Sequence, residues 1–241
     1  MKTQNCLFMT TNPILDVSAS PVENLALRLE TVVREAIAAR GRFSLALSGG
    51  STPKALYQLL ASDEWKGRFE WPQIDLFFGD ERAVAPDDAL SNFKMASEAL
   101  LNHVPARFFR MEAERSDLEA AARDYEAKIR ALGGPLDVVL LGLGDDGHTA
   151  SLFPHSPQLN ENEKWVTATP VASLEPHVRR LTLTFSCINA ARHQWFLAAG
   201  SGKAARLKQV LHGPRDVQAL PAQGVEGQVL WFVDEAAASA I

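Results

Sequence analysis

The sequence predicts an α/β protein in which a mainly parallel β-sheet carries helices on both faces. Short apolar runs of strand length alternate along the chain with amphipathic segments of about 10–16 residues. Glycines follow several of the apolar runs, as is typical of turns between a strand and a helix. Because sheets of this kind bind ligands beyond the carboxyl ends of their strands, the loops that follow the strands are the first candidates for chemistry.

The elements of the first half follow from capping signals and apolar runs. Ser20, Pro21 and Glu23 combine a capping box with proline at the first helical position, and Gly41 is placed to end the helix. We expect a helix from Pro21 to about Arg40, a buried strand from Phe43 to Leu47, a helix that Thr52 caps and Pro53 starts, running to about Ala61, a strand from Ile74 to Phe78, and a helix capped by Ser91 that runs to Leu101.

The second half continues the alternation, with one exception. We expect a helix from the capping box Ser116-Asp117-Leu118-Glu119 to about Leu132, strands around Val138, at Trp165 to Thr169, Leu181 to Phe185 and Trp195 to Ala199, a helix from Ser201 to His212, a strand from Val229 to Val233 and a short closing helix. Residues 160–185 contain strands with no helix between them. We therefore expect one antiparallel edge element there.

Composition narrows the class of protein. The 241 residues are 46% hydrophobic, which suits one domain spanning residues 1–241. The net charge of −5 and the absence of a dense basic block argue against a nucleic-acid partner. The sequence MKTQNCLFMTTNP lacks the apolar run of a signal peptide, and no window approaches a membrane span. Cys6 and Cys187 lie far apart, so we expect buried thiols in a reduced compartment and a cytoplasmic protein.

The segment from Val138 to His148 is the most informative part of the chain. An apolar run from Val138 to Leu143 reads as a buried strand, and a glycine-rich turn then presents His148 at its carboxyl end. Gly142 to Gly147 spell G-x-G-x-x-G. We reject a dinucleotide site, because Pro154 arrives too soon for a long helix and no acidic residue follows a second strand at the required distance. His148 is therefore the first candidate for chemistry in this turn.

Two loops have the composition of anion sites. Ser48, Gly49, Gly50, Ser51 and Thr52 lie between a strand and a helix, where backbone amides and hydroxyls can cradle a phosphate. The alternative is an ordinary glycine-rich turn with a capping threonine. The second loop, Gly200-Ser201-Gly202-Lys203, ends in a cation at a helix start, which suits a neighbouring anion better than it suits the helix dipole. Its alternative is a solvated surface lysine.

A third strand-end segment, Phe77 to Arg82, ends in charged residues. Arg82 can bind a phosphate or carboxylate, with Asp80 and Glu81 to orient it, and the alternative is a solvated loop with internal ion pairs. No metal-binding or serine-nucleophile motif is present, so we expect neither a metal nor a cofactor. Of the other histidines, His155 is a candidate to line the site. Structural or exposed positions are expected for His103, His177, His193 and His212.

These segments resemble the 6-phosphogluconolactonase family, which is related to the glucosamine-6-phosphate isomerases and deaminases. The matching stretches are LALSGGSTPKALYQLL (45–60), FFGDERAV (77–84), SNFKMASEALL (91–101), LDVVLLGLGDDGHTASLFP (136–154), RRLTLTF (179–185) and FLAAGSGKAARLKQVL (196–211). They occur in family order across nearly the whole chain. The resemblance implies a modified Rossmann-like sheet and metal-free hydrolysis of 6-phospho-D-glucono-1,5-lactone in the oxidative pentose phosphate pathway.

The resemblance also implies roles for individual residues. His148 corresponds to the catalytic histidine, and the sugar-phosphate contacts correspond to Ser48 to Thr52, Arg82 and Lys203. Arg179 is the candidate for the substrate or oxyanion contact, and Arg180 is its alternative. In the deaminases the histidine is followed by a Glu-Pro pair, whereas this chain has Phe153-Pro154, which favours hydrolysis over isomerisation.

The expected mechanism needs one general base and one site that binds the phosphate of the substrate. His148, as general base, takes a proton from water, hydroxide attacks C1, and the proton returns to the leaving ring oxygen. Asp146 is expected to orient the loop or the ring and not to act as a second base. The rival functions are an amino-sugar-phosphate isomerase or deaminase and a non-catalytic sugar-phosphate sensor. The expected partner is a small sugar-phosphate lactone, with no nucleic acid and no membrane, and the expected assembly is a monomer or a small homo-oligomer.

Overall fold

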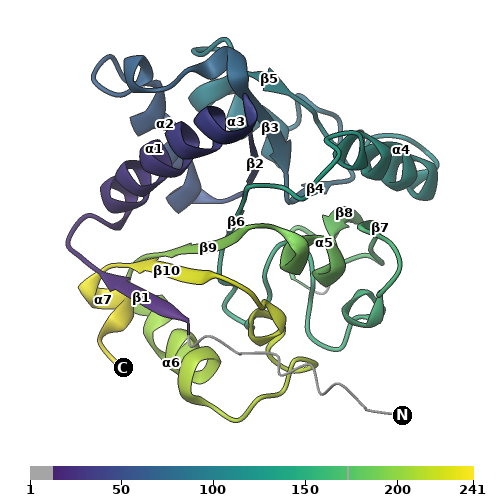
Figure 1. Cartoon of the computed structure of the whole chain (residues 1–241). Coiled ribbons are helices and arrows are strands. Elements are labelled where there is room, and N and C mark those ends of the chain that lie inside the picture. Colours follow the sequence, from purple (N-terminus) through teal and green to yellow (C-terminus); the bar gives the residue numbers. More distant parts are fainter. Residues whose placement is uncertain (1–12, 173) are drawn as a thin grey trace, which may run out of the picture.

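The computed structural model describes residues 13–172 and 174–241. Its main sheet has seven strands in the order β1-β10-β9-β6-β2-β3-β5, and every neighbouring pair in it is parallel. A smaller antiparallel sheet has the order β4-β8-β7. In Figure 1 the small sheet lies beside α4 and α5, and contacts of α4 with β7 and of α5 with β8 fix it there.

The element bounds are as follows. The strands are β1 Ile14–Val17, β2 Phe43–Leu47, β3 Ile74–Phe78, β4 Asp80–Arg82, β5 Arg107–Phe108, β6 Val138–Leu141, β7 Val166–Ala168, β8 Arg180–Leu183, β9 His193–Ala198 and β10 Val229–Val233. The α-helices are α1 Pro21–Arg40, α2 Ser51–Ala61, α3 Asn92–Ala96, α4 Leu118–Arg130, α5 Phe185–Ala190, α6 Ala204–His212 and α7 Glu235–Ala238. Short helical turns are η1 Lys66–Arg68, η2 Trp71–Gln73, the π-helical η3 Ser97–Leu101, η4 Pro157–Asn160, η5 Ser201–Lys203 and η6 Pro221–Gly224.

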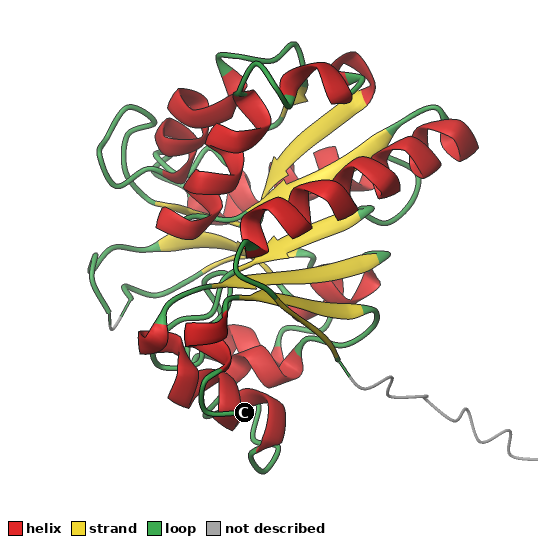
Figure 2. Ribbon diagram, turned by 90° about the vertical axis from the view of Figure 1, so that its left-hand side faces the viewer, coloured by secondary structure: helices red, strands yellow, loops and turns green. Residues whose placement is uncertain are grey.

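Helices cover both faces of the main sheet, as the alternating pattern predicted (Figure 2). Every residue of β2, β3 and β6 is buried, because helices exclude water from both sides of these parallel strands. Aromatic side chains fill the adjacent β9 and β10, where Phe196 and Trp231 stack with their ring centroids 3.8 Å apart. The predicted α/β class is therefore confirmed.

The antiparallel strands form a sheet of their own, whereas the sequence predicted one antiparallel element at the edge of the main sheet. The difference arises at Gly79, which separates β3 from β4. The Gly79 N–H donates to Leu47 O in the main sheet at 2.8 Å, and Gly79 O accepts from the Leu183 N–H in the small sheet at 2.8 Å. The chain thus passes from one sheet to the other within one residue.

Several helix caps differ from the predicted ones, although α1 starts at Pro21 as predicted. Ser20 precedes α1 but makes no side-chain capping bond, so the predicted capping box does not form. Asp117, not Ser116, caps α4 by accepting from the Ala120 N–H at 2.9 Å. The start of α2 lies two residues before the predicted one, and its N-cap is Gly50, so Thr52 is not a cap. Glycine has no side chain with which to cap, and the first amides of α2 therefore stay open.

Other predictions have clear outcomes. Gly41 ends α1 in a left-handed conformation (φ 75°), and Ser91 caps α3, whose helical path continues to Leu101, both as predicted. Cys187 is buried, and burial raises the pKa of its thiol to about 12. Cys6 lies outside the described residues. Across the part of the chain that the structure describes, no helix is long and apolar enough to cross a membrane.

Candidate active site

The candidate residues gather at the carboxyl edge of the main sheet. Parallel strands deliver their following loops to a common edge, and β2, β3, β6 and β9 are all members of this sheet. The phosphate-loop candidate follows β2, the charged strand β4 follows β3, the histidine loop follows β6, and the lysine loop follows β9. The alternation of strands and helices therefore places these four segments at one end of the fold.

His148 is held in a defined orientation by Asp146. The Nδ1 atom of the ring lies 2.6 Å from Asp146 Oδ1, and the same oxygen accepts from the His148 backbone N–H at 3.0 Å. Partial burial opposes ionisation of Asp146, but the hydrogen bond and charge of His148 dominate and lower the pKa of Asp146 below its usual value. An ionised Asp146 accepts a hydrogen bond from Nδ1–H, which leaves Nε2 as the ring nitrogen that can take a proton.

The imidazole is accessible, and its Nε2 atom has no hydrogen-bond partner among residues 13–172 and 174–241. The side chain of His148 is 22% exposed. The turn admits the ring only because residue 144 is glycine: a Cβ added there would overlap His148 Nδ1. The Gly144 N–H donates to His148 O at 2.9 Å and closes the turn. The histidine is thus both fixed and open to a small reactant.

Phe153 connects His148 to an arginine. Its ring centroid lies 4.7 Å from that of His148, and the guanidinium carbon of Arg180 lies 5.1 Å from the same ring. Phe153 is buried, so the two contacts occur on a side chain that cannot move far. This arrangement puts a cation near the base without a direct contact between them.

Two arginines face each other across the small sheet. Arg82 on β4 and Arg180 on β8 are directly opposed in the antiparallel register. Directly opposed like charges destabilise a sheet unless a counter-charge is present. Burial lowers the pKa of Arg180, which the charge of Asp80 partly opposes and that of Arg82 reinforces. The Nε atoms of both arginines are buried, and neither has an acceptor within the described residues. The pair therefore has unused donors suited to an anion.

Asp80 is engaged with other polar groups instead of pairing with Arg82. One of its oxygens accepts from Ser151 Oγ at 2.5 Å, and the other accepts from Asn92 Nδ2 at 3.1 Å. Asn92 Oδ1 accepts from Arg82 Nη1 at 2.6 Å. Asp80 thus acts on Arg82 through Asn92, and the predicted orienting role is indirect in this geometry.

Glu81 anchors the backbone around Arg82. Its buried carboxylate accepts from the N–H groups of Arg82, Asn92 and Phe93 at 2.7–2.8 Å and from Ser91 Oγ at 3.0 Å. Burial raises the pKa of Glu81, although the three backbone donors oppose this shift. The carboxylate caps the start of α3 and ties that start to β4.

The phosphate-loop candidate offers open backbone amides at the N-terminus of α2. The N–H groups of Gly49, Gly50, Ser51 and Thr52 have no acceptor in the described part of the chain. Ser48 differs from them, because its N–H donates to the hydroxyl of Tyr57 at 2.8 Å. That hydroxyl in turn donates to Ser48 O at 2.7 Å and braces the loop. Four amides, not five, are therefore available to an anion.

Lys203 reaches the histidine loop rather than solvent. Its Nζ atom lies 2.5 Å from Asp145 Oδ1, next to Asp146 in the chain. Arg206 supports the same turn by donating from Nε to Asp145 O at 2.7 Å. The carboxylate of Asp145 is 84% exposed, so an incoming anion can compete with it for Lys203.

Arg179 and His155 lie less favourably than predicted. Arg179 is exposed, and its Nε atom donates to Thr169 O at 3.1 Å, whereas Arg180 is the buried arginine near Phe153. The geometry therefore favours Arg180 over Arg179 for the substrate contact. His155 is exposed, and its backbone N–H donates to Gln218 O. In residues 13–172 and 174–241 no group of three His, Cys, Asp or Glu side chains could hold a metal ion.

Known proteins resemble this chain along most of its length. The sequence profile described as glucosamine-6-phosphate isomerases/6-phosphogluconolactonase matches residues 17–231. The chain belongs to this family. A 6-phosphogluconolactonase of Streptomyces coelicolor is 38% identical over 234 residues, covering 90% of this chain and 89% of that protein. One of Mycobacterium tuberculosis is 39% identical over 227 residues, covering 88% and 90%. The solved structure of 6-phosphogluconolactonase from Trypanosoma cruzi has a TM-score of 0.83 and 33% identity, covering 96% and 97%.

Membership of the glucosamine-6-phosphate isomerase/6-phosphogluconolactonase family confirms the resemblance found in the sequence. The family description includes two activities, an isomerase and a lactonase. The activity of one member therefore has to be inferred from the residues of its site. Contacts link Lys203 to the histidine loop, His148 to Phe153, and Phe153 to Arg180. Arg180 in turn is paired with Arg82 in the register of the small sheet. Asn92 completes these contacts, and the sequence alone gave that residue no role.

Proposed function

We propose that this chain hydrolyses 6-phospho-D-glucono-1,5-lactone to 6-phospho-D-gluconate, the second step of the oxidative pentose phosphate pathway. The observation that carries the proposal is the His148–Asp146 pair. The Nε2 atom of His148 has no hydrogen-bond partner in the described part of the chain, and Phe153 contacts both this imidazole and the buried Arg180. The names of the 38–39% identical relatives support the same substrate.

The phosphate end is proposed to bind at the start of α2. The open amides of Gly49 to Thr52 supply donors, and the dipole of the eleven-residue helix favours a negative charge there. Arg82 adds a cation that has donors without an acceptor among the described residues, and Lys203 exchanges Asp145 for the phosphate. This grip fixes one end of the sugar and leaves the lactone carbonyl to be oriented at His148.

The chemical step needs one base and one oxyanion partner. His148 Nε2 takes a proton from water while the water oxygen attacks C1 and forms a tetrahedral oxyanion. The C1–ring oxygen bond then breaks, and His148 returns the proton to that oxygen, so the product is the open-chain acid. The guanidinium of Arg180 is the proposed oxyanion partner, because it lies over Phe153 beside the base and has donors without an acceptor among the described residues, whereas Arg179 is exposed and donates to Thr169 O. Each role is assigned to a side chain of the protein, and we propose that the reaction is metal-independent.

Phe153 supports the lactonase over the deaminase alternative. A deaminase must open a ring and move a proton between carbons, and the related enzymes carry a glutamate at this place. In this chain the position is Phe153, whose buried phenyl ring contacts His148. A phenyl ring cannot donate or accept a proton in the reaction. A lactonase needs only an activated water at a carbonyl, so an apolar partner is sufficient.

The test is a direct comparison of substrates. Lactone generated by glucose-6-phosphate dehydrogenase should disappear faster with the protein than at the no-enzyme rate, and the acceleration should survive EDTA. Glucosamine 6-phosphate should release no ammonia. Ammonia release, or binding of sugar phosphates with no turnover of lactone, would overturn the proposal. Loss of activity with EDTA and its recovery with a divalent metal would overturn metal independence alone.

A further inference from the structure

The side chain of Asn92 lies at the centre of the anion-binding region. It is 2% exposed. Its Nδ2 atom donates to Asp80 O at 3.0 Å and to Asp80 Oδ1 at 3.1 Å, while its Oδ1 atom accepts from Arg82 Nη1 at 2.6 Å. One buried amide therefore uses its donor and its acceptor on two different charged residues.

The same amide contacts the phosphate loop. A Cβ added at Gly49 would overlap the Asn92 Oδ1 atom, so the loop approaches this side chain as closely as a glycine backbone allows. Asn92 thus lies between the open amides of α2 and the guanidinium of Arg82. Its size and position fix the spacing between two groups that are proposed to hold one phosphate.

The contacts of Arg82 explain what this spacing achieves. Its Nη1 atom donates to Asn92 Oδ1 and to Leu90 O at 2.9 Å, whereas the buried Nε has no acceptor in the described residues. The two bonds at Nη1 hold the planar guanidinium, and its Nη2 atom, which donates to no group of the described residues, stays available to a ligand. Without Asn92 the guanidinium would keep only the bond to Leu90 O and could rotate about it.

We propose that Asn92 is a positioning residue that makes the enzyme select phosphorylated lactones by holding Arg82 at a fixed distance from the phosphate loop. This inference rests on the proposed function. Asparagine is required because its two ends differ. Aspartate would turn an oxygen toward Asp80, and alanine would leave Asp80 Oδ1 and Arg82 Nη1 each without a partner.

Ser91 provides a matched control in the same turn. Its Oγ accepts from the Lys94 N–H at 3.2 Å and donates to Glu81 at 3.0 Å, and it forms no hydrogen bond with Arg82. Ser91→Ala therefore weakens the start of α3 without releasing the guanidinium. Comparison of this variant with Asn92→Ala separates positioning of Arg82 from general loosening of the helix.

The experiment measures kcat/KM for the phosphorylated lactone and for glucono-1,5-lactone, with the inhibition constant of inorganic phosphate. We expect Asn92→Ala to lower kcat/KM for the phosphorylated lactone about 10- to 100-fold, mainly through KM, and to weaken phosphate inhibition about tenfold. Turnover of glucono-1,5-lactone should stay within about twofold, and Ser91→Ala should leave phosphate inhibition unchanged. Equal losses on both lactones, or unchanged phosphate inhibition, would overturn the proposal.

A double-mutant cycle gives the second readout. In the Arg82→Ala background, Asn92→Ala should change phosphate affinity by less than about twofold, because the group it positions is already gone. Full additivity would overturn the proposal. Phosphate affinity can be measured by isothermal titration calorimetry without turnover. A wild-type protein that binds phosphate but hydrolyses no lactone would therefore refute the proposed function while leaving Asn92 testable.

Discussion

Charged side chains at the two edges of the main sheet differ in how completely they are paired. At the amino edge, buried Asp75 contacts Arg42 and Arg107 at 2.7 Å each, and Asp137 contacts Arg40 at 2.6 Å and Arg192 at 3.2 Å. Each of these carboxylates has two arginine partners.

At the carboxyl edge, Arg82 and Arg180 face each other across the small sheet. Within the described residues neither forms an ion pair with a carboxylate, and each has a buried Nε without an acceptor. The same residue type therefore occurs in a satisfied and in an unsatisfied setting within one fold.

This difference separates structural charges from charges that await a ligand. A buried carboxylate with two guanidinium partners has most of its hydrogen-bonding capacity filled, and its removal should affect folding. Two opposed guanidiniums with spare donors cost stability until an anion arrives. The comparison predicts that substitutions at the amino edge change stability, whereas substitutions at the carboxyl edge change catalysis.

The largest expected effect is on catalysis, at His148. His148→Asn keeps a donor that can reach Asp146 but removes Nε2, so kcat should fall about 10²- to 10⁴-fold, or about 3–5 kcal/mol in activation free energy. The melting temperature should change little. Steady-state kinetics with circular dichroism melts check both parts. A folded variant with an unchanged kcat would remove the histidine from the mechanism.

The next largest effect is on stability, at Asp75. Asp75→Asn leaves two guanidiniums without their buried counter-charge, so the free energy of unfolding should fall by about 3 kcal/mol. Urea denaturation measures this change, and kcat should be unaffected. Loss of kcat without loss of stability would contradict the contrast between the edges.

Asp75 also makes a prediction about pH. Burial alone would raise its pKa, but hydrogen bonds from Arg107 and Arg42 dominate and lower it. A carboxyl with a lowered pKa stabilises the fold above its usual pKa of about 3.9, and that contribution is lost as the pH falls. Below about pH 4 the difference in unfolding free energy between the wild type and Asp75→Asn should therefore shrink. A difference that stays constant to pH 2 would contradict this account.

Gly144→Ala tests the geometry of the histidine turn. The added Cβ would overlap the imidazole and push it from its contact with Asp146, and a displacement of about 1 Å costs about 100-fold in rate. Gly134→Ala is the control, since a Cβ there meets no atom within 4 Å. Equal activity of the two variants would show that the turn can shift to make room for a Cβ without displacing the imidazole.

Asp146→Asn should have a smaller effect than loss of the base itself. The amide oxygen can still accept a hydrogen bond from Nδ1–H, so kcat should fall only about 10- to 50-fold. Steady-state kinetics on the folded variant measure this change. A loss as large as that of His148→Asn would contradict a purely orienting role for Asp146.

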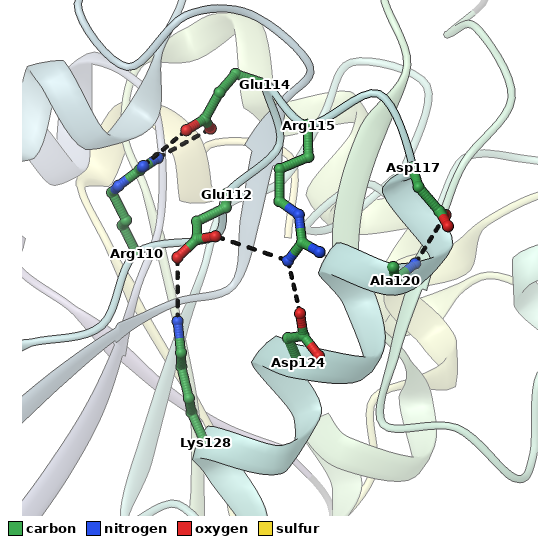
Figure 3. A network of polar contacts seen from close by, with 8 residues as sticks. All are labelled: Arg110, Glu112, Glu114, Arg115, Asp117, Ala120, Asp124 and Lys128. Carbon is green, nitrogen blue, oxygen red and sulfur yellow. Dashed lines mark hydrogen bonds and ion pairs between the residues drawn. The ribbon is translucent and has the colours of Figure 1, made fainter.

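The smallest effect is expected in the surface ion-pair network between β5 and α4, shown in Figure 3. Arg110 and Glu114 form a bidentate pair at 2.7 and 2.9 Å, but both are partly exposed to solvent. Glu114→Ala should change the free energy of unfolding by about 0.5 kcal/mol or less and leave the kinetics unchanged. A loss comparable with that of Asp75→Asn would mean that burial does not decide the value of these pairs.

The strands of the main sheet were largely predictable from the sequence. The predicted bounds of β2, β3 and β10 match the structure, because continuous apolar runs between turn residues leave few alternatives. The strand β4 was not predicted, since Asp-Glu-Arg carries no apolar pattern and pairs only through its backbone with a distant strand. The two-residue β5 gives a signal too short to read.

Within the site, chemistry was easier to predict than contacts. The histidine and the anion loops follow from residue type at strand ends. Their supporting contacts do not, because Asn92 meets Arg82 across ten residues and Ser151 meets Asp80 across seventy-one. Choosing Arg180 over Arg179 needed the pairing of β8 with β4, which no local pattern encodes.

The peptide unit at Gly79 has a mechanical consequence. Its N–H belongs to the main sheet and its carbonyl to the small one, so a shear between the two sheets would break a backbone bond on one side or the other. The small sheet, which carries Arg82 and Arg180, is thus attached through Gly79 to β2, the strand that precedes the phosphate loop. We therefore expect substrate to enter a preset frame, with any closing motion confined to the outer loops.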